Sequence, residues 1–174
     1  MKKIKILIII ITFLFSFPIH FMYNWFPNFL TSILFPVNES VWEHMKIIYT
    51  SILISSIIEY FIYKYKKIET HNFMLSIPIS SIIGIILYII TYQLVELFIP
   101  HNIIIALIIM LLTYILSAIV SYYILNLNEI KHQKLIGISL IIISYLIFAY
   151  LTYNPIKTNL FLDTEKNTYG ISNK

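Results

Sequence analysis

Residues Asn102–Leu125 read NIIIALIIMLLTYILSAIVSYYIL, a continuous apolar run without one charged side chain. A helix of about 20 residues is needed to cross the hydrocarbon core of a bilayer, so this run is long enough for one crossing. Four more apolar runs of similar length lie near residues 4–21, 41–63, 73–98 and 135–153. The sequence therefore predicts an all-α fold, an integral membrane bundle of about five transmembrane helices.

The composition favours the same class and excludes several others. The chain has 174 residues, of which 59% are hydrophobic and 11% charged, whereas about a quarter of the residues in a soluble domain are charged. No glycine-rich phosphate loop is present, and the net charge of +4 comes from lysines near the ends of apolar runs. We therefore expect the lipid bilayer as partner, and no nucleic acid or nucleotide. The absence of cysteine excludes a disulfide or a thiolate metal site.

The chain reads as one transmembrane bundle over residues 1–153, followed by an extracytoplasmic tail over 154–174. The first apolar run resembles a secretory signal, but no small-residue cleavage site follows it, so we expect it to remain as the first span. Lysines set the orientation, because cytoplasmic loops carry an excess of them. With five crossings, one face collects Lys2, Lys3, Lys5, Lys64, Lys66, Lys67, Lys131 and Lys134. The N-terminus is therefore predicted to be cytoplasmic and the tail extracytoplasmic.

Polar and small side chains recur every four residues within the runs, and residues four apart share one face of a helix. Examples are Thr12, Ser16 and His20 in the first run and Ser51, Ser55 and Glu59 in the second. Such stripes favour helix–helix contact, since small residues let backbones approach and hydroxyls bond across the interface. Glu59 is expected either to pair with a lysine or to have a buried functional role.

One segment, FPVNESVWEHMK over residues 35–46, carries most of the chemistry. Ser40 and Glu43 match a capping box, in which Ser40 caps the helix and Glu43 binds the Ser40 amide in return. Capping does not explain Glu39, His44 or Lys46, which makes this segment the best candidate for a site.

The same segment carries a family resemblance. The run PVNESVWEHMK, the Ile58-Glu59-Tyr60 ending of the second span, and Asp163 followed by Tyr169-Gly170-Ile171 are similar to an uncharacterised family of small bacterial polytopic membrane proteins. That family is a domain of unknown function with a PVNESVWEH-type motif. The resemblance implies a helical membrane fold in the bacterial cytoplasmic (inner) membrane, and it implies no activity.

The predicted topology gathers further ionisable groups at the outer face, where they are costly and are candidates for function. The expected binding residues are Asn38, Glu39, Trp42, Glu43, His44, Glu96 and Asp163. Candidate metal ligands are His20, His44 and His101, and candidate catalytic bases are Glu39 and Glu43. Histidine and carboxylate together suit a divalent metal such as zinc. We further expect His44 and Glu96 to meet, because their helices are joined by a short loop.

Three functions agree with this pattern. The first is binding of a cation, a small solute or a lipid headgroup at the outer polar cluster. The second is a membrane-embedded, metal-dependent hydrolase acting at the outer interface, with a glutamate as base. The third is an accessory subunit that docks a membrane protein partner. We favour the first, since the sequence contains no recognised catalytic motif.

Overall fold

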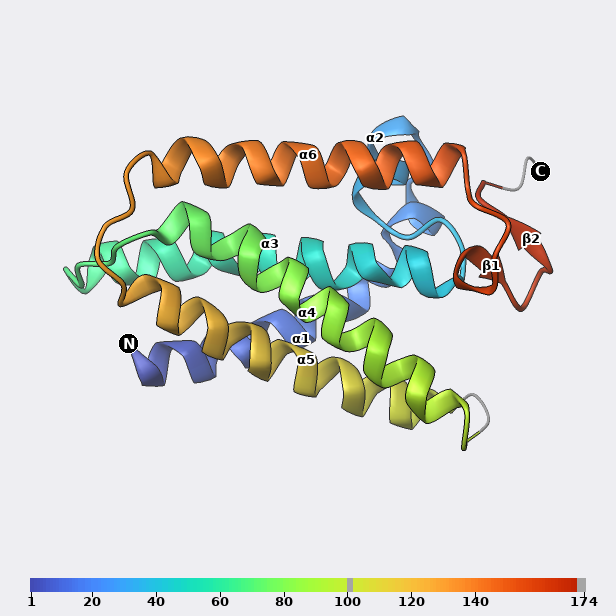
Figure 1. Cartoon of the computed structure of the whole chain (residues 1–174), viewed down its shortest axis with the longest axis horizontal. Coiled ribbons are helices and arrows are strands. Elements are labelled where there is room, and N and C mark those ends of the chain that lie inside the picture. The colour runs from blue at the N-terminus through green and yellow to red at the C-terminus, as the bar shows by residue number, and fades with distance from the viewer. Residues whose placement is uncertain (100–101, 172–174) are drawn as a thin grey trace.

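The structure is a computed structural model that describes residues 1–99 and 102–171. Five long helices form it: α1 (Lys2–Trp25), α3 (Val41–Tyr65), α4 (Phe73–Glu96), α5 (Ile103–Leu125) and α6 (Gln133–Tyr153) (Figure 1). A short helix, α2 (Phe29–Leu34), lies between α1 and α3. After α6 the chain forms a 3-10 turn, η1 (Asn159–Phe161), and an antiparallel hairpin of β1 (Leu162–Asp163) and β2 (Thr168–Tyr169).

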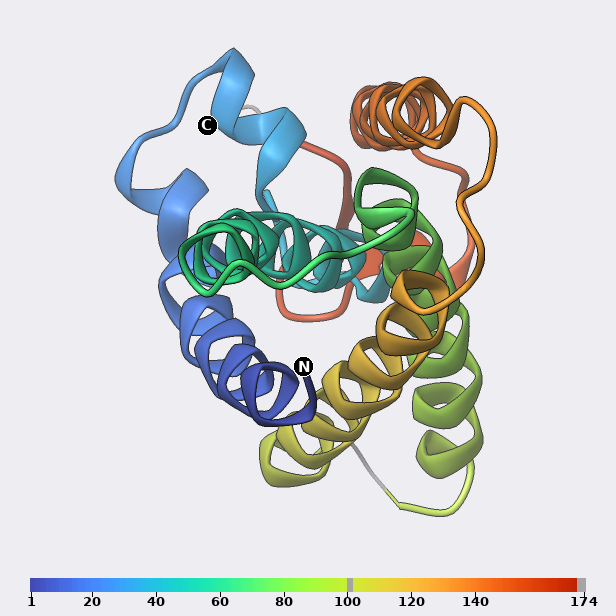
Figure 2. The ribbon, with the colours of Figure 1, turned by 90° about the vertical axis from the view of Figure 1, so that its left-hand side faces the viewer.

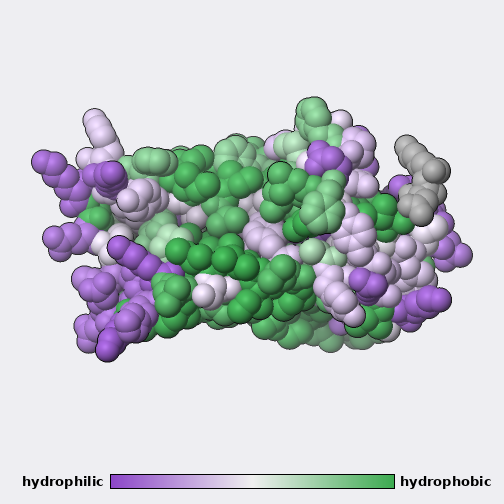
Figure 3. All heavy atoms as spheres, turned by 90° about the horizontal axis from the view of Figure 1, so that it is seen from above, coloured by the Kyte–Doolittle hydropathy of each residue, from purple (hydrophilic) through white to green (hydrophobic). Residues whose placement is uncertain are grey.

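All five long helices are long and apolar enough to cross a membrane. Each coincides with one apolar run of the sequence, so the prediction of an all-α bundle is confirmed. On the face that Figure 3 shows, hydrophobic residues cover the middle of the molecule and hydrophilic residues gather at its two ends. The first helix is longer than its run, since nothing after Phe21 interrupts the backbone before Pro27. Its last turn adds exposed Trp25 to the apolar surface.

Helix α3 lies at the centre of the bundle, with α1 on one side and α4 on the other (Figure 2). Helix α4 packs against both α5 and α6. Glycines permit two close approaches: a Cβ at Gly84 would meet Ser117 of α5, and one at Gly137 of α6 would meet the backbone of Met74. The polar stripes face one another, as in the hydrogen bond of 2.6 Å that Thr12 Oγ1 donates to Ser55 Oγ.

The two ends of the bundle differ. The lysine-rich end holds the N-terminus and the loops over residues 66–72 and 126–132. The tail end holds α2, the segment over 35–40 and the chain after α6. The tail folds back on the bundle there, since Phe161 stacks on Trp42 of α3 with ring centroids 4.9 Å apart.

Candidate functional site

The first turn of α3 is capped by a different arrangement from the one the sequence predicts. Ser40 is the N-cap, and its Oγ accepts a hydrogen bond of 3.3 Å from the Glu43 amide, as expected. The return bond is made by Asn38 instead, whose Oδ1 accepts from the Ser40 amide at 2.9 Å. The carboxylate of Glu43 is therefore available to other partners.

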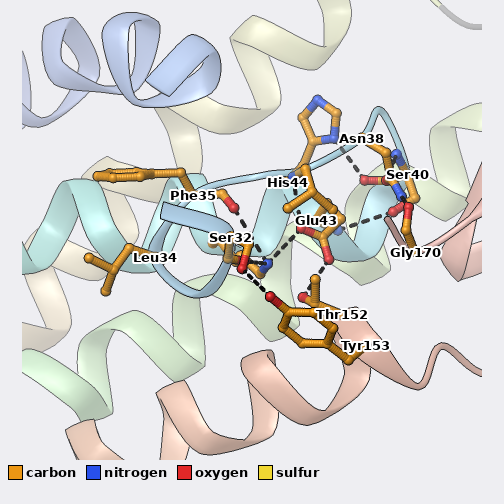
Figure 4. Close-up of polar contacts among 12 residues, drawn as sticks. Ser32, Leu34, Phe35, Asn38, Ser40, Glu43, His44, Thr152, Tyr153 and Gly170 are labelled. Atoms are coloured by element: carbon orange, nitrogen blue, oxygen red, sulfur yellow. Dashed lines mark hydrogen bonds and ion pairs between the residues drawn. The ribbon is translucent and has the colours of Figure 1, made fainter. Parts of the chain in front are cut away.

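Those partners make Glu43 part of a buried network at the tail end. Its Oε2 accepts from the amide of Val37 at 3.0 Å and pairs with Nζ of Lys46 at 2.7 Å. Its Oε1 accepts from Oγ1 of Thr152 on α6 at 2.8 Å (Figure 4). Both oxygens of Glu43 are thus engaged with protein groups.

Lys46 extends this network to α2. Its side chain is 0% exposed, and its Nζ donates to the carbonyl oxygens of Ser32 at 2.7 Å and Phe35 at 3.4 Å. Breaking a buried ion pair leaves an uncompensated charge in an apolar region, which is strongly destabilising. The Glu43–Lys46 pair therefore fixes α2, α3 and α6 relative to one another at this end.

Beside this network, two histidines and a glutamate form a separate group. His20 lies near the end of α1, Glu39 lies just before α3, and His44 lies in the first turn of α3. Oε2 of Glu39 is 3.6 Å from Nε2 of His20 and 3.5 Å from Nε2 of His44. One ligand atom from each residue lies within 4.8 Å of the other two, so the His20–Glu39–His44 group could hold a metal ion.

The backbone orients one of the two imidazoles. Nδ1 of His44 lies 2.8 Å from the carbonyl oxygen of Ser40, and a carbonyl can only accept. Nδ1 therefore carries a proton, and the other ring nitrogen, Nε2, faces Glu39. Metal-binding histidines usually have such a partner on their other nitrogen. His20 lacks one, because its Nδ1 is buried and bonded to no described residue.

The dimensions of the group fit a small transition metal. Zinc bonds to nitrogen and oxygen are about 2.0–2.2 Å long, which places tetrahedral ligands about 3.3–3.5 Å apart. The two separations from Glu39 are close to that value, and the rings of His20 and His44 have centroids 5.3 Å apart. Small side-chain rotations would bring all three atoms onto one ion.

The tail brings further groups to this end. Asn38 Nδ2 donates to the carbonyl oxygen of Gly170 at 2.9 Å, which pins the end of the hairpin to the start of α3. Oδ1 of Asp163 accepts from the amides of Glu165 and Lys166 at 3.0 and 3.1 Å, so this carboxylate closes the hairpin turn. Glu165 itself is exposed and interacts electrostatically with His20.

The expected meeting of His44 and Glu96 does not occur: no ion pair joins them among the described residues, and the carboxylate that His44 meets is Glu39. Helix α4 crosses α3 obliquely and continues beside α5, so the ends of α3 and α4 separate (Figure 1). Glu96 is exposed and interacts with Tyr88 and Tyr92 on its own helix. His101 lies outside the described residues.

Sequence reasoning missed two contributors, Thr152, which binds Glu43, and Glu165 near His20, and it named Lys46 without assigning Glu43 as its partner. Lys46 had a visible signal, since it follows Glu43 by three residues and lies inside an apolar run. Thr152 and Glu165 had none, because their contacts depend on how α6 and the tail fold back.

The fold and the site together define a class: an all-α bundle of membrane-spanning type with a histidine–carboxylate group at one end. The chain belongs to the family described as "Family of unknown function (DUF6512)", whose model matches residues 1–171. The resemblance to a family of unknown function is thereby confirmed at that level. Comparisons with curated proteins and with solved structures found no match.

Proposed function

We propose that this protein is a multi-pass membrane protein that binds a divalent transition metal, with zinc the best fit, at the His20–Glu39–His44 group. One observation supports it above the others: three ligand atoms from two helices and a loop lie within 4.8 Å of one another. Two imidazoles and one carboxylate suit zinc, whereas magnesium and calcium prefer oxygen ligands. Among the ligands considered from the sequence, a cation therefore fits better than a neutral solute or a lipid headgroup.

The proposed location is the bacterial cytoplasmic membrane, with the lysine-rich end in the cytoplasm. The excess of lysine at that end supports this orientation, and the motif resemblance supports the bacterial membrane. In this topology the metal group faces the extracytoplasmic side and takes its ion from there.

The experiment is a metal-binding measurement on purified protein in detergent. After removal of metal with a chelator, the wild-type chain should bind one zinc per chain in competition with a chromogenic chelator. His44→Ala should weaken binding by more than about 100-fold, since even the loss of a residue that only orients a ligand costs about 10–100-fold. The matched control is His132→Ala, which removes an exposed histidine from the lysine-rich end. Equal zinc binding by the wild type and His44→Ala would refute the proposal.

A metal-dependent hydrolase is the second candidate, and the ligand set is the observation that favours it. Two histidines and one glutamate leave one coordination position for water, as in catalytic zinc sites. Glu43 is unsuited as the general base, because both its oxygens are bound to protein groups. Glu165, exposed and close enough to influence His20, is the candidate that remains. Hydrolysis of an ester or amide lipid by the zinc-loaded wild type, lost in Glu165→Gln while zinc stays bound, would support this candidate.

The accessory-subunit hypothesis stays a prediction. Purification under mild detergent tests it, because an accessory subunit should be recovered with a companion protein in a fixed ratio.

A further inference from the structure

A second buried ion pair lies toward the lysine-rich end. Nζ of Lys5 on α1 is 2.6 Å from Oε1 of Glu59 on α3, and the two side chains are 7% and 5% exposed. Lys5 was expected to be one of the orienting lysines, but its ammonium group points into the bundle. Ionisable groups within membrane helices are costly, and by default they are candidates for function.

The bonds around this pair are asymmetric. Lys5 Nζ also donates to Ser121 Oγ of α5 at 2.7 Å. Tyr63 OH donates to Oε1 of Glu59 at 2.7 Å. This is the same oxygen that Lys5 contacts. Oε2 of Glu59 receives no hydrogen bond from any residue within 1–99 and 102–171. This carboxylate therefore keeps one oxygen available for a further donor.

A cavity of ≈ 30 Å³ lies beside the pair, and we call it the Lys5–Glu59 chamber. Helices α1, α3, α4 and α5 all line it, and its walls carry the hydroxyl groups of Thr12, Ser55, Ser56, Ser80, Tyr114, Ser117 and Ser121. A buried water needs about 10–15 Å³ of such space and two or more polar partners. The chamber therefore has room for about two waters.

One hydroxyl in the chamber wall points to a water there independently of the charges. The Oγ of Ser117 is buried, and it makes no hydrogen bond with a described residue. Ser117 is 2% exposed. Buried polar atoms without a partner are rare and costly, and ordered water is their usual partner when the protein supplies none.

We infer that the Lys5–Glu59 chamber is an intramembrane proton site, in which water delivers a proton to Oε2 of Glu59. The step converts the pair of ammonium and carboxylate into an ammonium beside a neutral carboxylic acid, and release of the same proton to water restores the pair. No other atom is transferred. The inference is independent of the metal group at the other end of the bundle.

A proton fits this chamber better than a metal ion does. The ammonium of Lys5 already occupies the position next to Oε1, and a divalent metal ion would bring two further positive charges beside it in a region of low dielectric, whereas a proton brings one. A proton instead forms a covalent bond to Oε2 and needs no coordination shell. Among the residues that the structure describes, the other titratable groups around the pair are tyrosines, Tyr63 on α3 and Tyr114 and Tyr122 on α5, while α4 contributes Ser80.

The test is infrared difference spectroscopy of the full chain in lipid bilayers during an acid titration. A protonated carboxylic acid has a C=O stretching band that the carboxylate lacks. We expect one such band to be lost in Glu59→Gln and kept in Glu69→Gln, which removes an exposed carboxylate near the same end. An unchanged set of bands in folded Glu59→Gln would overturn the inference.

A second variant keeps the inference testable if Glu59→Gln does not fold. Lys5→Met removes the ammonium that contacts Oε1 of Glu59. The C=O stretching band of Glu59 should therefore move in frequency relative to the wild type, because that stretch responds to the hydrogen bonds of the carboxyl group. A band in Lys5→Met at the wild-type frequency would also overturn the inference.

Discussion

Nε2 of His44 lies 3.5 Å from the carboxylate of Glu39, while the other ring nitrogen of His44 faces the carbonyl oxygen of Ser40 at 2.8 Å. The two ring nitrogens of His44 thus have different partners, and both partners belong to the start of α3. Because the helix N-terminus fixes the Ser40 carbonyl, it also fixes the direction in which Nε2 of His44 points. Glu39 is positioned by the same turn, just before the cap. One local structure thereby arranges two of the three candidate ligands.

The first prediction concerns the carboxylate of this group. Glu39→Gln should weaken zinc binding by more than about 100-fold, since it removes a charged ligand itself rather than a residue that only orients one. The free energy of unfolding should change by less than about 1 kcal/mol, because the Glu39 side chain is partly exposed and Ser40 provides the cap. Chelator competition and thermal unfolding in detergent measure the two effects.

Glu129→Gln is the matched control, because Glu129 is an exposed carboxylate at the lysine-rich end. It should leave zinc affinity unchanged. If Glu39→Gln lost as much free energy of unfolding as free energy of zinc binding, Glu39 would have a structural role rather than a role as metal ligand.

The second prediction concerns the buried pair beside the site. Glu43→Gln should destabilise the protein by about 3–5 kcal/mol, because it leaves the ammonium of Lys46 without its buried partner charge. Lys46 is 0% exposed, so water cannot compensate at the existing geometry. Thermal or denaturant unfolding in detergent gives the change.

The double variant Glu43→Gln with Lys46→Met separates lost pairing from lost packing. It should be more stable than Glu43→Gln alone, since the uncompensated charge is gone. The losses of free energy of unfolding in the two single variants, each relative to the wild type, can be added. If the double variant lost that full sum, Glu43 and Lys46 would not be coupled as the structure indicates.

The fold was predictable to a large extent, and the reason is physical. Apolar runs such as 102–125 leave the chain few alternatives to membrane-length helices, because backbone polar groups in an apolar layer must be satisfied within the helix. The role of Ser40 as N-cap was also predictable, because a cap is a local interaction.

The site was predictable only where the contacts are local. Glu39 and His44 lie five residues apart and the sequence named both, whereas the assignment of Glu43 as a candidate base overlooked Lys46 and Thr152. The proposed pairing of His44 with Glu96 is wrong because helix neighbours need not stay parallel, and α4 turns away along α5. Lys5 was assigned to the orienting lysines because its partner, Glu59, is brought near only by the packing of α1 on α3.

The third prediction is the orientation of the chain. An alkaline phosphatase reporter, which requires the extracytoplasmic side, should be active when fused after Lys174, and the same reporter fused in the loop over residues 66–72 should be inactive. The reason is the excess of lysine at the end that carries this loop. A phosphatase active only in the second fusion would reverse the topology and place the metal group in the cytoplasm.

The last prediction concerns the attachment of the tail. Asn38 Nδ2 donates to the carbonyl oxygen of Gly170, and both residues are buried. Asn38→Ala removes this bond and also the bond to the Ser40 amide, leaving buried polar groups unpaired at a cost of about 1–3 kcal/mol. If the tail opens locally, amide exchange in the hairpin should become about 5- to 150-fold faster, because each 1.4 kcal/mol is a factor of about ten in the opening equilibrium. Hydrogen–deuterium exchange with mass spectrometry measures it on peptides covering residues 162–169. Asn154→Ala, which alters an exposed asparagine at the end of α6, should leave the hairpin rate unchanged. Hairpin exchange in Asn38→Ala at the wild-type rate would mean that the stacking of Phe161 on Trp42 holds the tail without Asn38.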